Sequence, residues 1–339
     1  MLTIAARNAQ DALRKSLTYL DEFGIARSTR AGDVIVLPTP VTTQYSNPTE
    51  LCVFWQERDA NPFFHLFEGL WMLAGRNDVD WIAQFNKNIA NFSDDGETFH
   101  GAYGQRWRAT FGFDQYKALI NNLETAPNCR RQVLTMWYPP ADLLDQANKK
   151  DLPCNTHAYF WQDCGELNMT VCCRSNDVVW GCYGSDSVTF GLLLQFIAEA
   201  LDLEVGKYWQ MSNNWHAYKK TIEPLGAMAG QLPYDPYATG TTRPFPRLMK
   251  TKDWMNFMVE LQMFIDQGEA ALGYREPFIK RVALPMLRAW RVFKSEEAPA
   301  RYELAIKELS NCQAPDWRYM CTQWIERRHR RWMSKKSST

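Results

Sequence analysis

The sequence is most constrained by a long apolar segment, SVTFGLLLQFIAEALDLEVG, which spans residues 187–206. Its length and apolar content predict a helix that ends in a turn. Polar and bulky residues alternate in ELNMTVCC before it and in GKYWQM after it, which predicts strands on both sides. Further strand-like segments near 131–137 and 156–162, a helix at 113–124 and a second apolar helix, NPFFHLFEGLWMLAG, indicate a fold that combines helices with a sheet.

The last part of the chain has a different pattern. Residues 252–334 predict three amphipathic helices, which are punctuated by prolines at 277, 285, 299 and 315. No flexible linker or internal repeat precedes them, so we expect a catalytic domain over residues 1–250 and a helical extension over 251–339 that packs on it. The basic stretch ERRHRRWMSKK near the end is more typical of a solvated helix end than of a nucleic-acid contact.

Charge and cysteine content exclude several classes of protein. The chain has 38 basic and 38 acidic residues, so no net field attracts it to nucleic acid or to a membrane, and a small partner is expected. We find neither a signal-peptide pattern nor an apolar run of about 18 residues, which predicts a cytoplasmic protein. The nine cysteines form no CxxC pair and the five histidines are scattered, so we expect reduced thiols and no metal site.

One cysteine, Cys154, has a sequence context that differs from that of the others. In LPCNTHAYF, Cys154 directly follows a proline and precedes a predicted strand. A thiol becomes a nucleophile when cations or helix ends stabilise its thiolate. Arginines that could bind a phosphate dianion occur at five positions, and surface salt bridges are the alternative role for them: Arg27, Arg30, Arg130, Arg131 and Arg174.

Two acids occupy apolar surroundings. Glu68 lies inside the apolar helix at 61–75, where a carboxyl group is costly unless it is hydrogen-bonded or functional. Asp186 lies in CYGSD, between a predicted strand and the long apolar helix. It could be a functional acid or the residue that caps that helix.

From about residue 20 to residue 220, the order of these motifs resembles the thymidylate synthase superfamily. PC at 153–154 is similar to its nucleophile motif, and RSNDV at 174–178 follows at the spacing that the family keeps. Five more segments resemble family motifs in the same order along the chain: FEGLWMLAG, AYGQRWR, CRRQV, DLEVG and NNWHAY.

The resemblance implies an α+β fold in which a twisted mixed sheet, packed with helices, forms the interface of a homodimer. It also implies that Cys154 attacks C6 of a pyrimidine nucleotide, whose C5 then takes up the methylene of 5,10-methylenetetrahydrofolate. The 5′-phosphate would be held by Arg174, Ser175 and either Arg27 or Arg30. Arg130 and Arg131 would join them from the other subunit.

Further roles follow from the same resemblance. Glu68 would relay protons at position 4 of the base, and Tyr103 would lie near the proton on C5. His216 and Tyr218 would bind the 3′-hydroxyl of the sugar. Asp177 and Gly181 would lie at the folate.

The chain departs from thymidylate synthases at the residue that reads the base. The family uses an asparagine 16 residues before the aspartate of DLEVG, and here that count from Asp202 reaches Asp186. A carboxyl group accepts from the 4-amino group of cytosine and, when protonated, donates to N3, which favours dCMP over dUMP. The same exchange marks the deoxycytidylate hydroxymethylases of bacteriophages. This alignment needs one inserted residue after Gly181, so Ser185 is a competing match.

Two features that exclude water from thymidylate synthases are not visible. No tryptophan lies between Trp81 and Trp107, and the chain ends in WMSKKSST rather than in an apolar tail. Water would then trap the exocyclic methylene as a hydroxymethyl group. The sequence therefore predicts a dCMP 5-hydroxymethyltransferase. The alternatives are a dCMP C5-methyltransferase, a dUMP hydroxymethylase or thymidylate synthase, and a nucleotide- or nucleic-acid-binding protein without turnover.

Overall fold

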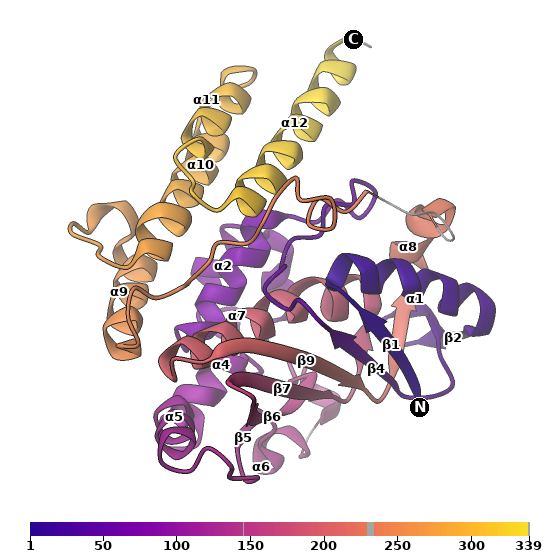
Figure 1. The fold of residues 1–339 in the computed structure, drawn as a ribbon. Helices are drawn as coiled ribbons and strands as arrows, with labels where there is room; N and C mark the ends of the chain where they lie inside the picture. Colours follow the sequence, from indigo (N-terminus) through magenta and orange to yellow (C-terminus); the bar gives the residue numbers. More distant parts are fainter. Residues whose placement is uncertain (145, 229–233, 338–339) are drawn as a thin grey trace.

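The computed structural model describes residues 1–144, 146–228 and 234–337, and its centre is a mixed sheet of six strands (Figure 1). The strand order is β1 (Leu2–Ala6), β4 (Val41–Tyr45), β9 (Glu204–Ser212), β7 (Glu166–Cys173), β6 (Asn155–Asp163) and β5 (Val133–Thr135). β1 pairs with β4 and β7 with β9 in parallel, and the remaining pairs are antiparallel. The predicted mixed sheet is confirmed.

A second sheet of four strands lies beside the first. Its order is β2 (Ile25–Thr29), β3 (Gly32–Val36), β10 (Trp215–Tyr218) and β8 (Asn176–Asp177). The sequence gives no strand signal for β2, because all five of its side chains are exposed and no apolar alternation marks it. β8 and β10 are parallel and pair Asp177 with His216.

Two apolar helices cover one face of the six-stranded sheet. All 15 residues of α7 (Asp186–Ala200) are buried, and α7 packs on β7 and β9. The helix α2 (Pro62–Leu73) packs in turn on α7. The two helices approach closely at Gly69, where an added Cβ would lie 2.6 Å from Leu192 Cδ1. Glu68 is thereby held next to the start of α7.

The remaining helices of the first 250 residues are shorter or peripheral. They are α1 (Ala9–Phe23), α3 (Val79–Ala83), α4 (Tyr103–Gln105), α5 (Gln115–Thr125), α6 (Pro139–Asp142) and α8 (Lys219–Ile222). Irregular or tight helical turns occur in the same part of the chain at Lys87–Phe92, Arg106–Thr110, Gln146–Asn148, Val178–Ser185 and Glu223–Met228. Two more follow in the C-terminal part, at Gly268–Ala270 and Ile279–Ala283.

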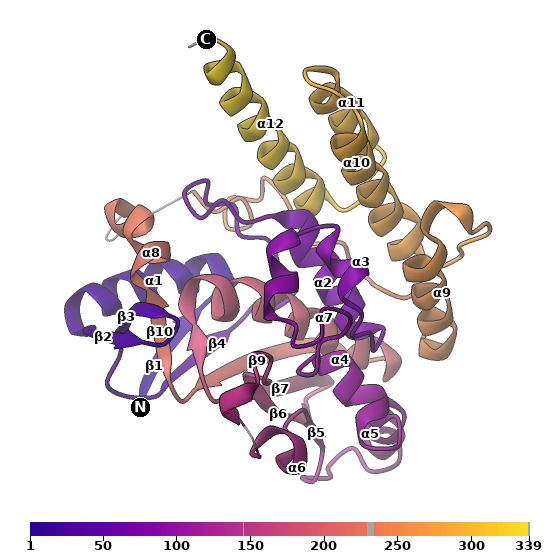
Figure 2. The same ribbon diagram turned by 180° about the vertical axis from the view of Figure 1, so that it is seen from behind.

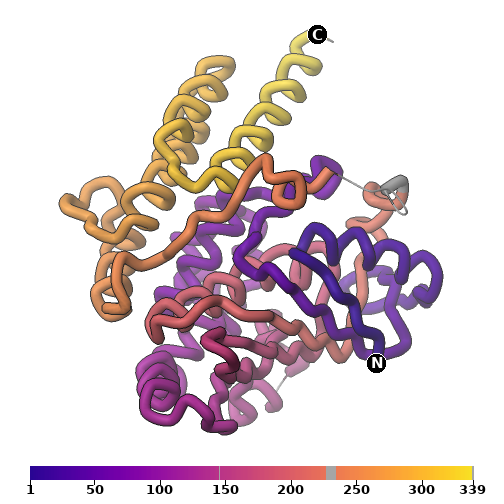
Figure 3. Tube along the Cα trace, viewed as in Figure 1, coloured from indigo at the N-terminus to yellow at the C-terminus, as the bar shows by residue number. Residues whose placement is uncertain are grey.

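The C-terminal part contains four main helices, not the three predicted: α9 (Trp254–Gln267), α10 (Leu284–Ser295), α11 (Ala300–Leu309) and α12 (Pro315–Ser337). Pro285 lies in the first turn of α10, where proline is tolerated, so it does not end the helix as the sequence pattern suggested. Figure 2 shows α10, α11 and α12 projecting from the side opposite the sheet, with α10 and α12 contacting α2. The end of α12 therefore lies far from β1 (Figure 3).

None of the helices in the described ranges is both long and apolar enough to cross a membrane.

Candidate active site

Cys154 lies in the loop just before β6, and Arg174 fixes this loop. The Arg174 side chain donates from Nε to the Pro153 carbonyl at 2.9 Å and from Nη2 to the Leu152 carbonyl at 3.0 Å. The same Nη2 is 3.8 Å from Cys154 Sγ. Burial raises the pKa of the Cys154 thiol, the nearby guanidinium opposes this effect, and Asp186 and Asp151 add to it. Cys154 and Arg174 are therefore neighbours in the folded chain.

Asp186 begins α7 and its buried carboxylate faces the start of β6. Its Oδ1 accepts a hydrogen bond of 3.0 Å from Asn155 Nδ2. The same amide nitrogen donates to the Tyr103 hydroxyl at 3.0 Å. Burial raises the pKa of Asp186 to about 6, although hydrogen bonds from Asn155 and Asn176 lower it. The side chain of Asp186 does not cap α7, because Asp186 is itself the first residue of this helix.

Glu68 lies close enough to Asp186 for their charges to interact. It is buried in α2, and its Oε2 has no hydrogen-bond partner within the described residues. Burial raises the pKa of Glu68 to about 7, the Asp186 charge adds to the rise, and a hydrogen bond with Ser185 opposes it. Both candidates for the base-reading position, Ser185 and Asp186, therefore face this cluster of acids.

The segment before α7 accommodates the extra residue that the sequence comparison required. Val178–Ser185 forms a widened helical turn that is kinked at Tyr183 and Gly184, where the backbone is not helical. Gly181 lies inside this turn, and an added Cβ would lie 2.7 Å from Asn176 Oδ1. Because any side chain here would displace Asn176, a glycine keeps the space beside Asp186 open.

The residues predicted for sugar and folate lie next to one another in the smaller sheet. Asp177 pairs in register with His216, and the His216 ring contacts Tyr218 edge-on with centroids 5.4 Å apart. Asp177 also caps the following turn, accepting from the backbone N–H of Trp180 at 2.8 Å. Burial raises the pKa of Tyr218, and the nearby Arg30, in the turn between β2 and β3, opposes this rise.

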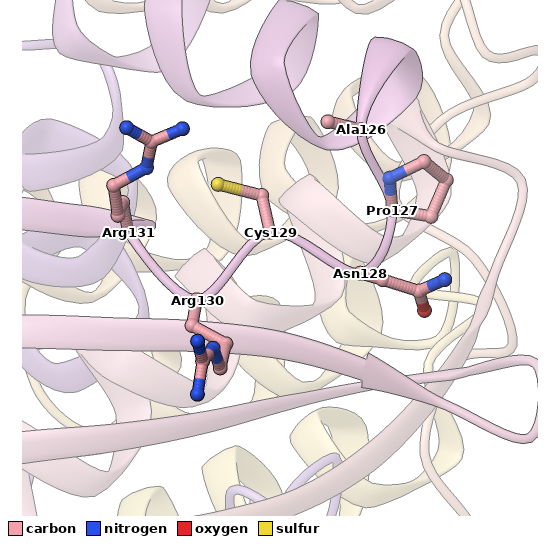
Figure 4. A pocket seen from close by; sticks show the side chains of 6 residues that line it. All are labelled: Ala126, Pro127, Asn128, Cys129, Arg130 and Arg131. Atoms are coloured by element: carbon pink, nitrogen blue, oxygen red, sulfur yellow. The ribbon is translucent and has the colours of Figure 1, made fainter.

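Three predicted arginines are not brought to Cys154. Arg27 is exposed on β2. Arg130 and Arg131 are exposed ahead of β5, beside a cavity of about 690 Å³ that is lined by residues 126–131 and not by Cys154 (Figure 4). Within this loop, Arg131 lies near Cys129 and lowers the pKa of its thiol. Ser175 lies in the turn after β7, next to Arg174.

Sequence reasoning missed three polar residues of the site. Asn155 is fully buried and its Oδ1 accepts from Gln210 Nε2, on β9, at 2.8 Å. Arg58 is buried, its guanidinium lies 4.5 Å from the Trp180 ring, and its terminal nitrogens have no hydrogen-bond partner among the described residues. The sequence does show Asn155 and Gln210 as polar residues inside strands. It does not show that they hydrogen-bond to each other, because β6 and β9 are not neighbours in the sheet.

No group of His, Cys, Asp and Glu suited to a metal occurs in residues 1–144, 146–228 and 234–337. The site combines a thiol beside a guanidinium with two carboxyl groups whose pKa values lie near neutrality. This arrangement can form a covalent bond to a ligand and move protons on it.

Comparisons with known proteins agree on the family. Residues 58–259 match the model of the family described as thymidylate synthase. A deoxyuridylate hydroxymethyltransferase of Pseudomonas phage M6 is 45% identical, over 99% of this chain and 97% of its own length. A deoxyuridylate hydroxymethyltransferase of Bacillus phage SP01 is 35% identical over 53% of this chain and 49% of its own.

The fold has a counterpart among solved structures. The crystal structure of thymidylate synthase from T4 phage superposes with a TM-score of 0.58 at 19% identity, covering 73% of this chain and 91% of that one. The predicted fold and enzyme class are confirmed: the chain belongs to the thymidylate synthase family and is a folate-dependent one-carbon transferase.

Proposed function

We propose that the protein is a dUMP hydroxymethyltransferase, which transfers the methylene of 5,10-methylenetetrahydrofolate to C5 of dUMP and adds water to it. The name of the relative that matches over the whole chain supports this substrate and product. The sequence analysis put dCMP first on the strength of Asp186, and the structure supplies a physical reason to prefer uracil.

The observation that supports this proposal most directly is the hydrogen bond from Asn155 to Asp186. An amide donor stabilises the carboxylate form, and with a pKa of about 6 Asp186 is mostly ionised at pH 7. A carboxylate accepts the N3–H of uracil. Cytosine presents an acceptor at N3, which an ionised carboxylate repels. At N3, the ionised Asp186 therefore suits uracil better than cytosine.

The other site residues suit the chemistry that the family resemblance implies. Cys154 adds as the thiolate to C6 of the base, and the Arg174 guanidinium favours that thiolate. Glu68, with a pKa of about 7, can supply a proton toward O4 as negative charge develops there. The Tyr103 hydroxyl, anchored by Asn155, takes the position near the C5 proton.

The residues beside Asp177 fit a folate. Trp180 presents an exposed indole on which an aromatic ligand can stack, and the buried Arg58 guanidinium, 4.5 Å from the ring centroid, adds positive charge that favours an anionic ligand. Bound methylenetetrahydrofolate supplies one carbon at the oxidation level of formaldehyde. When water ends the reaction, C5 loses a proton, the oxygen of water remains on the product, and tetrahydrofolate leaves without being oxidised.

A homodimer explains the position of Arg130 and Arg131. They precede the edge strand β5, away from the Cys154 of their own chain. The neighbouring face of the sheet exposes apolar side chains that a second copy could cover: Val133, Tyr159 and Trp161. We propose that each subunit donates this arginine pair to the 5′-phosphate site of the other, where Arg174, Ser175 and Arg30 or Arg27 complete it.

The remaining residue roles in this proposal are those that the sequence resemblance to the family implies. His216 and Tyr218 bind the 3′-hydroxyl of the sugar, and Asp177 and Gly181 border the folate. Residues 251–339 form a helical extension on a catalytic domain of residues 1–250, and the enzyme acts in the cytoplasm on a free nucleotide.

The second candidate substrate is dCMP. A protonated Asp186 would donate to N3 of cytosine and accept from its 4-amino group, and its raised pKa makes this form accessible in mildly acidic solution. The reductive alternative, in which the product is methylated, requires hydride transfer to outpace the entry of water.

The substitution Asp186→Asn tests the choice of base. An asparagine amide still accepts from N3–H of uracil and donates to O4, so dUMP turnover should persist within about tenfold of the wild type. Asp163→Asn, at the exposed end of β6, is the control. If the wild type uses only dCMP and Asp186→Asn creates dUMP turnover, the cytosine interpretation is correct instead.

A further inference from the structure

A buried chain of polar side chains links the centre of the sheet to Asp186. The Tyr208 hydroxyl donates to Gln210 Oε1. Gln210 Nε2 donates to Asn155 Oδ1 at 2.8 Å, and Asn155 Nδ2 donates to Asp186 Oδ1 at 3.0 Å. Gln210 and Asn155 are both fully buried, so no exposed water competes for these groups.

Each side-chain amide along this chain presents its oxygen to one neighbour and its NH₂ group to the next. A side-chain amide has one acceptor oxygen and one donor nitrogen. Because Gln210 presents its donor to Asn155, the oxygen of Asn155 must face Gln210 and its NH₂ group must face Asp186 and Tyr103. A flipped Asn155 would instead place its oxygen against the carboxylate and repel it.

We propose that Asn155, oriented by Gln210, is a positioning residue that holds Asp186 as a hydrogen-bond acceptor and so makes the site select uracil over cytosine. This inference rests on the proposed function, since it explains how that site chooses its base. Asn155 acts through Asp186 and has no separate contact with the base.

The groups around Asp186 oppose its ionisation, and the Asn155 amide counteracts this effect. Glu68 of α2 and Asp177 of β8 are the acidic groups close enough for their charges to couple with that of Asp186. The coupled thiols and phenols come from several elements and offer no positive charge: Cys154, Cys173, Cys182, Tyr45, Tyr103 and Tyr208. Hydrogen bonds from Asn155 and Asn176 are the two contributions that favour the carboxylate.

The decisive experiment measures binding of dUMP and dCMP to the full chain without folate, by titration calorimetry between pH 5 and 8. In the wild type, dUMP should bind without proton uptake at pH 7, and dCMP should bind more weakly with uptake of about one proton. In Asn155→Ala, the preference for dUMP at pH 7 should fall by about tenfold, and the pH at which it is lost should rise by about one unit.

Two further variants distinguish a positioning role of Asn155 from a purely structural one. Gln210→Met leaves Asn155 in place but releases its orientation, so the preference should shift in the same direction by a smaller factor. Asn168→Ala removes another buried asparagine of the same sheet, whose Oδ1 accepts from the Lys207 backbone, and should leave the preference unchanged. Melting curves of all three report whether they fold.

The outcomes distinguish this inference from the proposed function. If the folded Asn155→Ala and Gln210→Met variants keep the wild-type preference and its pH dependence, Asn155 does not select the base and the inference is overturned. If the wild type itself binds dCMP better than dUMP at pH 7, the proposed substrate is wrong, whatever the variants do.

Discussion

The Asn155 amide nitrogen lies 3.0 Å from a carboxylate oxygen of Asp186 and 3.0 Å from the hydroxyl oxygen of Tyr103. One amide thus joins Asp186, which we propose reads the base, to Tyr103, which we propose lies near the C5 proton. Asn155 directly follows Cys154, so the proposed nucleophile and this amide share one backbone segment, which Arg174 anchors. Small displacements of this segment would affect covalent attack and base recognition together.

Removing the Cys154 thiol should abolish turnover without abolishing nucleotide binding. Cys154→Ala should lower kcat by about 10⁴-fold or more, because no other group can add to C6, while the Kd for dUMP changes little. Steady-state kinetics and titration calorimetry provide the two numbers. Cys164→Ser, in the exposed turn between β6 and β7, is the control. Loss of binding with retained turnover per bound nucleotide would contradict a nucleophilic role.

Glu68 should give the enzyme an alkaline limit. Burial raises its pKa to about 7, and in the proposed reaction it donates a proton, so kcat should fall as the pH rises through about 7. Glu68→Gln cannot transfer a proton and should lower kcat by about 10² to 10⁴-fold. The variant should also lose that limb of the pH profile. A profile of kcat that keeps the same limb in Glu68→Gln would assign it to another group.

A mixture of two inactive variants should recover activity. Arg130 and Arg131 line a cavity that does not include the Cys154 of their own chain, so in the proposed dimer Arg131→Ala and Cys154→Ala damage different halves of a shared site. After subunits are exchanged by mild denaturation, about a quarter of wild-type activity should return, since half the dimers are mixed and each has one intact site. The unmixed variants treated in the same way are the controls. No recovery in a confirmed dimer would show that the arginines serve their own chain.

Asp316 should make the stability depend on pH. It is buried at the start of α12, accepts from the Tyr237 hydroxyl at 2.8 Å, and burial raises its pKa to about 7. The folded pKa exceeds the unfolded value of 3.8, so this contribution to stability is greatest below pH 3.8 and is lost as the pH rises to about 7. Asp316→Asn should therefore raise Tm at pH 8 by about 5 °C. The difference should vanish near pH 4, and a difference that is independent of pH would refute the buried charge.

The sequence predicted the elements of the fold better than their pairing. The helices around Glu68 and after Asp186 were evident because their apolar runs are long, whereas β2 was missed because its side chains are all exposed. Cys154, Asp186 and Glu68 were found through motifs and through acids in apolar surroundings, and the structure brings them together. Asn155 and Gln210 could not be paired from sequence, since β6 and β9 meet through β7, and their contact exists only in the folded sheet.

The most direct test of the central claim is the product formed from dUMP. The purified enzyme is incubated with methylenetetrahydrofolate and either dUMP or dCMP at pH 7, and the mass of the nucleotide and the oxidation state of the folate are measured. We predict a gain of about 30 mass units on dUMP, for one CH₂O, with tetrahydrofolate released. A gain of about 14 mass units with dihydrofolate formed, or turnover of dCMP in place of dUMP, would contradict the account.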